Sequence, residues 1–220
     1  MPVDLEWVIL QVLNRLSFII GIVLLTTCAS NANVATRPQA SVIDADLDHN
    51  GISEHIELDA QRDPALTIRR GNKLLWQGVH GRWKPWKLAI ADVDGDGQRE
   101  IIVGVFKATR YFPKPHNCLF IYGWNGRRAF PKWLGSTLSK PFIDFVFTDL
   151  DSNGSNDLIA IETLRDGKHC VAAYTWNGFG FTLDWQRGAW SQARFVANED
   201  HLIVIEADGV RTVISNNSED

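Results

Sequence analysis

Three copies of one acidic nine-residue loop recur along the chain, and they constrain its fold more than any other feature. They cover residues 46–54, 92–100 and 149–157, with oxygen-bearing side chains at positions 1, 3, 5 and 9 and glycine at position 6. Glycine allows the backbone to turn sharply there. An apolar run typical of a β-strand follows each copy. The spacing of about 50 residues therefore predicts a β-rich repeat protein.

The loop side chains are of the kind that bind Ca²⁺ through carboxylate and amide oxygens. An EF-hand begins with the same spacing, but its last carboxylate stands at position 12 and a helix follows. We therefore expect Ca²⁺ as the cofactor, and we expect its ligands to be Asp46, Asp48, Asn50, Glu54, Asp92, Asp94, Asp96, Glu100, Asp149, Asp151, Asn153 and Asp157. The second loop has four acids against three in each of the others, so it is expected to bind most tightly. An ordinary polar turn is the alternative for a single copy.

Similarity between the repeats extends beyond the loops. Residues 118–126 align with residues 170–178, and tryptophan recurs at Trp76, Trp133 and Trp185. Each unit is predicted to contain a strand, the loop, and three further strands, which is the composition of one propeller blade. A fourth unit, from residue 193, lacks the loop glycine and the spaced acids, so no metal is expected there. The predicted fold class is all-β, a small β-propeller with four blades, three clear and one degenerate.

Closure of the ring is expected to use residues 34–39 as the outer strand of the last blade. The alternative is an open arc, whose exposed edge strands would favour dimerisation.

The loops and strands resemble the VCBS and FG-GAP-like repeat family, whose blades carry the loop Asp-x-Asp-x-Asp/Asn-Gly-x-x-Asp/Glu that is also found in integrin α-subunit propellers. The resemblance covers about residues 41–215 and implies a propeller with the same Ca²⁺ ligands. The literal Phe-Gly and Gly-Ala-Pro signatures of the family are absent, and family propellers commonly have more blades.

The N-terminal region predicts export. Residues 16–27 form an apolar stretch preceded by Arg15, which fits a signal peptide and is too short to span a bilayer. Cys28 follows a lipobox-like segment and is a candidate for lipidation, while residues 30–32 offer an ordinary cleavage site; a buried first helix is the alternative. We expect residues 1–32 to be the signal and a short linker, residues 33–220 the propeller, and the location extracytoplasmic: secreted, periplasmic or membrane-anchored through Cys28.

Two clusters of basic and aromatic residues stand outside the repeat pattern. They provide the candidate ligand-binding residues Trp83, Trp86, Arg110, Tyr111, Phe112 and Lys114, which could form a platform for a sugar or an anionic polymer. The alternative is a proline-braced loop with solvated basic side chains. Cys118 and Cys170 hold equivalent positions in neighbouring units and are expected to be buried free thiols.

A net charge of −4 makes nucleic acid an unlikely partner. No nucleophile elbow, HExxH helix or P-loop is present, so the sequence favours a role other than catalysis. The predicted function is an exported calcium-binding β-propeller that acts as a protein- or glycan-binding module. The alternatives are a small propeller hydrolase or lyase acting on polysaccharide, marked by several acids at the ring centre, and a purely structural role for the loops.

Overall fold

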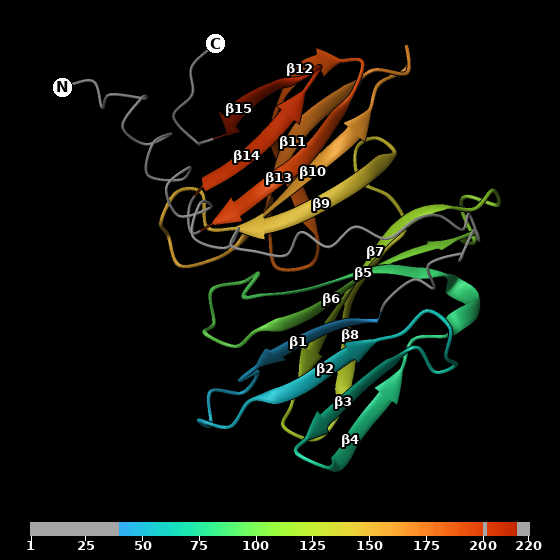
Figure 1. Cartoon of the computed structure of the whole chain (residues 1–220), viewed down its shortest axis with the longest axis vertical. Coiled ribbons are helices and arrows are strands. Elements are labelled where there is room, and N and C mark those ends of the chain that lie inside the picture. The colour runs from blue at the N-terminus through green and yellow to red at the C-terminus, as the bar shows by residue number, and fades with distance from the viewer. Residues whose placement is uncertain (1–39, 200–201, 215–220) are drawn as a thin grey trace, which may run out of the picture. The chain divides into compact units, whose positions relative to one another are not determined.

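The computed structural model describes residues 40–199 and 202–214, which belong to one compact unit. The described residues form four antiparallel sheets, in each of which consecutive strands are neighbours (Figure 1). The first two sheets contain β1 (Ser41–Ala45), β2 (Glu54–Leu58), β3 (Leu66–Arg70) and β4 (Lys73–Gly78), then β5 (Pro85–Ala91), β6 (Glu100–Lys107), β7 (His116–Trp124) and β8 (Ala129–Gly135). The last two contain β9 (Phe142–Thr148), β10 (Asp157–Thr163), β11 (His169–Trp176) and β12 (Phe181–Trp190), then β13 (Ala193–Glu199), β14 (Leu202–Ala207) and β15 (Val210–Ile214). The all-β prediction is confirmed.

Helical structure in the described part of the chain is limited to one short 3₁₀ turn, Gly81–Trp83. No helix among these residues is long and apolar enough to cross a membrane. The predicted signal, Cys28 and the expected closing strand at 34–39 lie outside the described residues.

The strands differ in how deeply they are buried. Nearly all residues of β6 and β10 are buried, whereas β4 and β12 contain no buried residue. A continuous apolar run is typical of a strand that is covered on both faces. The sequence of β6, Glu-Ile-Ile-Val-Gly-Val-Phe-Lys, has this character, and β6 contributes Ile101 and Val103 to a core on one face and Ile102 to a core on the other.

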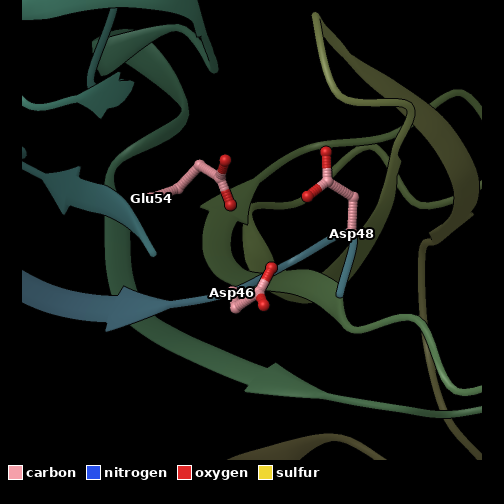
Figure 2. A group of neighbouring side chains, drawn as sticks. All are labelled: Asp46, Asp48 and Glu54. Carbon is pink, nitrogen blue, oxygen red and sulfur yellow. The ribbon is translucent and has the colours of Figure 1, made fainter. Parts of the chain in front are cut away.

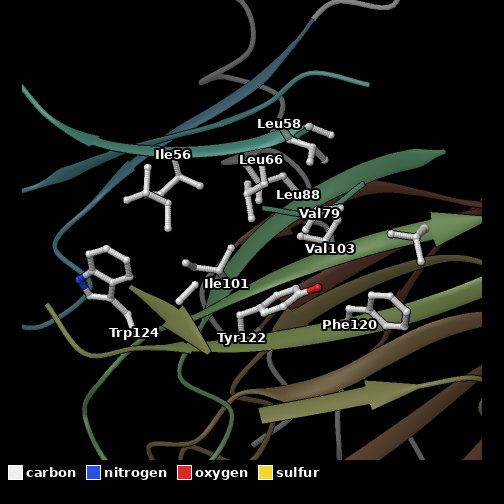
Figure 3. Close-up of a cluster of buried hydrophobic side chains, with 14 of the residues drawn as sticks. Ile56, Leu58, Leu66, Val79, Leu88, Ile101, Val103, Phe120, Tyr122 and Trp124 are labelled. Carbon is white, nitrogen blue, oxygen red and sulfur yellow. The ribbon is translucent and has the colours of Figure 1, made fainter. Parts of the chain in front are cut away.

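Three apolar cores lie between consecutive sheets. In the first core, Ile56 and Leu66 of the first sheet face Ile101 and Phe120 of the second (Figure 3). The second core joins the second and third sheets around Phe145, and the third core joins the third and fourth sheets. The first strands of successive sheets are also in contact, β1 with β5, β5 with β9, and β9 with β13.

The described residues do not show the expected closed ring. No apolar core among the described residues joins the fourth sheet to the first. The face of the first sheet that turns away from its core carries Asp44 and His55, whose side chains lie 2.8 Å apart. The corresponding face of the fourth sheet carries Arg194 paired with Glu206 at 3.1 Å. Charged faces cannot form an apolar core like the other three, which gives a physical reason for the difference.

The recurring tryptophans are partly buried and pack against the apolar cores. Trp76, Trp133 and Trp185 lie against the first, second and third cores, respectively. A Cβ atom added to Gly135 would lie 2.0 Å from the Trp133 ring, so the indole rests directly on this glycine. These tryptophans therefore contribute to packing.

Cys118 and Cys170 are buried free thiols in different sheets. Burial raises the pKa of both thiols. A raised pKa keeps a thiol protonated near neutral pH, so both side chains act as small apolar groups.

Candidate metal loops and clefts

The three acidic loops lie side by side at one end of the sheets. They connect β1 to β2, β5 to β6, and β9 to β10. The Arg99 amide of the second loop is 3.4 Å from the Leu47 carbonyl of the first, and the Asn156 amide of the third is 2.7 Å from the Asp92 carbonyl of the second. Hydrogen bonds therefore link the loops in series.

The aspartate at position 1 organises each loop by accepting backbone hydrogen bonds. One of its oxygens accepts the amide of the position 6 glycine, at 2.7 Å (Gly51 to Asp46), 2.8 Å (Gly97 to Asp92) and 3.0 Å (Gly154 to Asp149). The three glycines have φ of 84°, 85° and 92°, respectively. Residues with a side chain rarely adopt this conformation, which explains glycine at position 6.

The position 5 side chains cap the turn. They accept the amide of position 7, at 2.9 Å (Ile52 to Asn50), 2.7 Å (Gln98 to Asp96) and 2.8 Å (Ser155 to Asn153). The sequence predicts these side chains as metal ligands. In the structure, a side-chain oxygen of each accepts a backbone hydrogen bond.

The acid at position 9 connects the start of its loop to the second strand. Glu54, Glu100 and Asp157 are all buried. One oxygen of each accepts the amide of position 2, at 3.1 Å (Leu47 to Glu54), 3.0 Å (Val93 to Glu100) and 3.2 Å (Leu150 to Asp157). The other oxygen faces the remaining acids of the loop or a neighbouring strand.

The acids converge in the first two loops. Asp46, Asp48 and Glu54 have carboxylate oxygens within 4.8 Å of one another, and Figure 2 shows the three groups turned towards a common space. Asp92, Asp94 and Glu100 form the same arrangement. In the described residues, Asp149, Asp151 and Asp157 do not come this close together.

The first loop fits a hard cation. Its donors are all oxygen atoms, and Asp48 Oδ1 is buried without a hydrogen-bond partner among the described residues. A buried carboxylate oxygen without a partner is unfavourable, and a metal ion would satisfy it.

A side-chain cation from a later strand already contacts the acids of the first two loops. Arg70 of β3 lies 2.9 Å from Glu54 and 3.5 Å from Asp48. Lys132 of β8 lies 2.7 Å from Glu100 and 2.5 Å from Asp94. Burial raises the pKa of Glu100, although Lys132 opposes this effect. Sequence analysis missed both cations, because each stands outside its loop by many residues.

The third loop has different neighbours. The Thr175 hydroxyl donates to Asp157 at 3.1 Å and lies 2.6 Å from Asp184. Burial raises the pKa of Asp157, and the charges of Asp151 and Asp184 add to this shift. A further acid thus lies near the third loop, where the first two loops have a cation.

Clefts lie at the opposite end of the sheets, between the connections of neighbouring sheets. The first cleft has a volume of about 570 Å³ and is lined by residues that include Leu58, Lys84 and Trp86. The second cleft has a volume of about 530 Å³ and is lined mainly by apolar and proline residues, together with Lys114 and Lys140. A third, of about 290 Å³, contains His169 and Arg194. The acidic loops and the clefts therefore lie at opposite ends of the sheets.

The six candidate ligand-binding residues do not gather on one surface. Trp83 packs against the first core and lies 5.6 Å from the Phe120 ring. Trp86 packs against the second core and also lines the first cleft. Phe112 and Lys114 line the second cleft. Tyr111 is 77% exposed, and Arg110 lies over its ring at 5.8 Å.

A buried polar network supports the wall of the second cleft. Glu162 of β10 is fully buried and accepts hydrogen bonds from the hydroxyl groups of Tyr174 and Ser139, the backbone amide of Lys140 and the side chain of Gln186. The Tyr174 hydroxyl in turn accepts the Ser139 amide at 3.1 Å. Glu162 therefore fixes the backbone at residues 139–140, which line the cleft.

An ion pair joins the first strands of the second and third sheets. Lys87 Nζ of β5 lies 2.5 Å from Asp144 of β9, and 5.9 Å from the Phe195 ring centre of β13. The hydrolase alternative calls for several acids in this region, whereas this contact joins one acid to one base.

Comparison with known proteins adds no assignment. No family model matches the chain, and no curated protein matches it.

Proposed function

We propose that this protein is an exported Ca²⁺-binding repeat protein of the β-propeller type, which binds a protein or glycan ligand at the end opposite its metal loops. The observation that carries the proposal is the row of three loops with one hydrogen-bonding scheme at one end of the sheets. The predicted signal supports export, which would expose the loops to plentiful Ca²⁺.

The propeller interpretation is supported by the organisation of the sheets. Each sheet is an up-and-down meander, and successive first strands are in contact, which is the order of propeller blades. Closure of the ring stays a prediction, and it would require the charged outer faces of the first and fourth sheets to meet.

Ca²⁺ is the ion that suits the donor set best. Carboxylate, amide and carbonyl oxygens without sulfur or imidazole favour a hard cation over Zn²⁺ or copper. Mg²⁺ requires near-ideal octahedral geometry, whereas Ca²⁺ accepts irregular loops. The loop carboxylates would hold the ion, which would supply charge neutralisation and link the loop to its second strand.

The second cleft is the best candidate for the ligand. Its apolar wall includes Phe112 and three prolines, and it offers basic groups at Lys114 and Lys140. Such a surface combines stacking on an aromatic ring with charge-assisted hydrogen bonds, and both are used to bind sugars and peptides.

Calcium removal tests the metal half of the proposal. Adding excess chelator to the full chain is expected to lower the melting temperature, because an ion that binds only the folded state stabilises it by about 2.7 kcal/mol per site at 100 times the dissociation constant. The measurement is thermal unfolding with CaCl₂, with chelator, and with MgCl₂ as a control. Identical melting curves in all three conditions would contradict metal binding.

Substitution in the second cleft tests the ligand half. Phe112→Ala combined with Lys114→Ala is expected to weaken binding to glycan arrays or polyanionic polysaccharide by at least about tenfold, because one stacking surface and one charge are lost. Phe179→Ala, at an 82% exposed position in another connection, is the matched control. Equal binding by both variants would exclude this cleft, and turnover of a bound polysaccharide would favour the hydrolase or lyase alternative.

A further inference from the structure

We propose that the first and second clefts act together as one binding surface, and that their ligand is an acidic polysaccharide long enough to occupy both. The segment 106–117, which connects β6 to β7 and includes the adjoining strand ends, lines both clefts. The inference rests on the proposed ligand binding at the second cleft, and it adds a second site and a ligand class. The two volumes, about 570 and 530 Å³, are usual for ligand pockets.

The two clefts adjoin at the start of β7. Asn117 lines the first cleft, and the preceding residue, His116, lines the second. The Asn117 side-chain amide donates to the Phe142 carbonyl at 2.8 Å. Phe142 directly follows Pro141, which also lines the second cleft. One ligand chain that lies across this position can therefore contact both clefts.

Hydrogen bonds hold the segment 106–117 in place. The Thr109 amide donates to the Phe112 carbonyl at 2.9 Å, and the Phe112 amide donates to the Thr109 hydroxyl at 3.3 Å. The ring nitrogens of His116 lie 2.8 Å from the Lys114 carbonyl and 2.5 Å from the Ser136 carbonyl. A wall that is ordered before binding loses little conformational freedom when a ligand arrives.

The segments around the two clefts are basic, although the whole chain has a net charge of −4. Residues 81–87, 106–117 and 136–141 contain no acid and seven basic residues: Arg82, Lys84, Lys87, Lys107, Arg110, Lys114 and Lys140. Among the described residues, only Lys87 and Lys140 of these seven come within 4.0 Å of a carboxylate. The other five have no acidic partner there, and their charge favours an anionic ligand.

Acids near the first cleft have basic neighbours. The wall opposite the segment 106–117 includes Gln61, which lies between Asp59 and Asp63 in the sequence. Asp59 lies 2.9 Å from Arg62, and Asp63 lies 3.4 Å from the ring of His80. Among the described residues, no carboxylate lines either cleft. An anionic ligand therefore meets little repulsion in either of them.

Exposed aromatic rings favour a sugar chain over a simple anion. Phe106 lines the first cleft and Phe112 the second, and they are 39% and 46% exposed. Tyr111, next to Phe112, is 77% exposed. Aromatic faces stack on the apolar faces of sugar rings. The Asn117 Oδ1 atom accepts no hydrogen bond from the described residues, so it can accept one from a sugar hydroxyl.

Calorimetric titration of the full chain with hyaluronan oligosaccharides tests the inference. The dodecasaccharide is expected to bind at least about tenfold more tightly than the tetrasaccharide, because linked groups that reach two sites gain roughly 10²–10⁴-fold at most. Chondroitin sulfate is expected to bind as well. A neutral chito-oligosaccharide of matched length is expected to bind at least about tenfold more weakly, because it has no carboxylate for the basic side chains.

Variants of each cleft test whether both are needed. Lys84→Asn combined with Phe106→Ala alters the first cleft, and Phe112→Ala combined with Lys114→Ala alters the second. Asparagine suits position 84, where φ is 48°. Each double variant is expected to reduce the gain from tetrasaccharide to dodecasaccharide to less than about twofold, since one of the two linked sites is lost.

The matched control removes the same two groups at the end of the acidic loops. It is Lys73→Asn combined with Phe179→Ala, and both positions are exposed. The control is expected to keep the full gain with ligand length. Circular dichroism checks that each variant folds.

The outcomes separate the two proposals. A first-cleft variant that keeps the full gain would overturn the inference, and loss of binding in the second-cleft variant would still support the proposed function. Poly-L-glutamate that binds as tightly as the dodecasaccharide would overturn the ligand class. A wild-type chain that binds neither hyaluronan nor chondroitin sulfate at low salt would also overturn the inference, while a different glycan that binds at the second cleft would leave the proposed function standing.

Discussion

Replacing Phe145 with alanine is expected to lower the free energy of unfolding by about 3–5 kcal/mol, the usual cost of deleting a buried aromatic ring. Phe145 is fully buried in the second core. Its ring contacts Trp86 at 5.5 Å, Phe142 at 6.3 Å and Phe147 at 6.1 Å, measured between ring centres. The cavity would therefore open where the second and third sheets meet.

Urea unfolding followed by tryptophan fluorescence measures this loss. Phe179→Ala is the matched control, because the same group is removed from a side chain that is 82% exposed. The control is expected to stay within about 0.5 kcal/mol of the wild type. If both variants unfold at the same urea concentration, the second core does not hold the sheets together as described.

Replacing Glu162 with valine is expected to lower the free energy of unfolding by about 3–5 kcal/mol, because removing one member of a buried polar network leaves its partners unpaired. Val105 occupies the equivalent position of the second sheet, so valine fits a strand of this kind. In the third sheet, however, the Tyr174 hydroxyl and the Lys140 amide would lose their acceptor.

A double-mutant cycle separates this network from simple burial. Adding Tyr174→Phe to Glu162→Val is expected to cost less than the sum of the two single changes, because the two groups are unpaired together. Glu206→Ala, which removes an acid paired with Arg194 on a more exposed face, is the control, with an expected loss of about 0–1 kcal/mol. A Glu162→Val variant as stable as this control would show that the network does not brace the cleft wall.

Much of the local structure could be predicted from the sequence. The alternation of acids and glycine over nine residues predicts the loop, and the apolar runs beside it predict the strands, because both depend on neighbours in the chain. The packing of the recurring tryptophans could also be expected, since Trp76, Trp133 and Trp185 stand at one position of the repeat. These features could be predicted without knowing which strands pair with one another.

The contacts around the loops could not be predicted in the same way. Arg70 stands 16 residues after Glu54, and Lys132 stands 32 residues after Glu100, so only the strand pairing brings each to its acid. The first unit takes its cation from the third strand and the second unit from the fourth, which hides the pattern from a simple alignment. The pairing of the strands places both cations next to the acids of their loops.

Residues that are close in sequence need not lie close in space. Trp83 and Trp86 are three residues apart, yet Trp83 lies in the 3₁₀ turn and packs on the first core, while Trp86 lies in β5 and packs on the second. Sequence spacing does not decide ring closure either, which stays a prediction. Repeat spacing counts units, but it does not show whether the outer faces of the first and last units are apolar.

The hydrogen bonds that join the loops in series give the row a mechanical character. The second loop is bonded on both sides, to Leu47 through Arg99 and to Asn156 through Asp92, whereas among the described residues the first and third loops are each joined to this row by bonds on one side. In a linear array with nearest-neighbour coupling, disorder starts at the ends and the centre is the last element to loosen. The middle loop is therefore expected to be the last of the three to lose its ordered conformation.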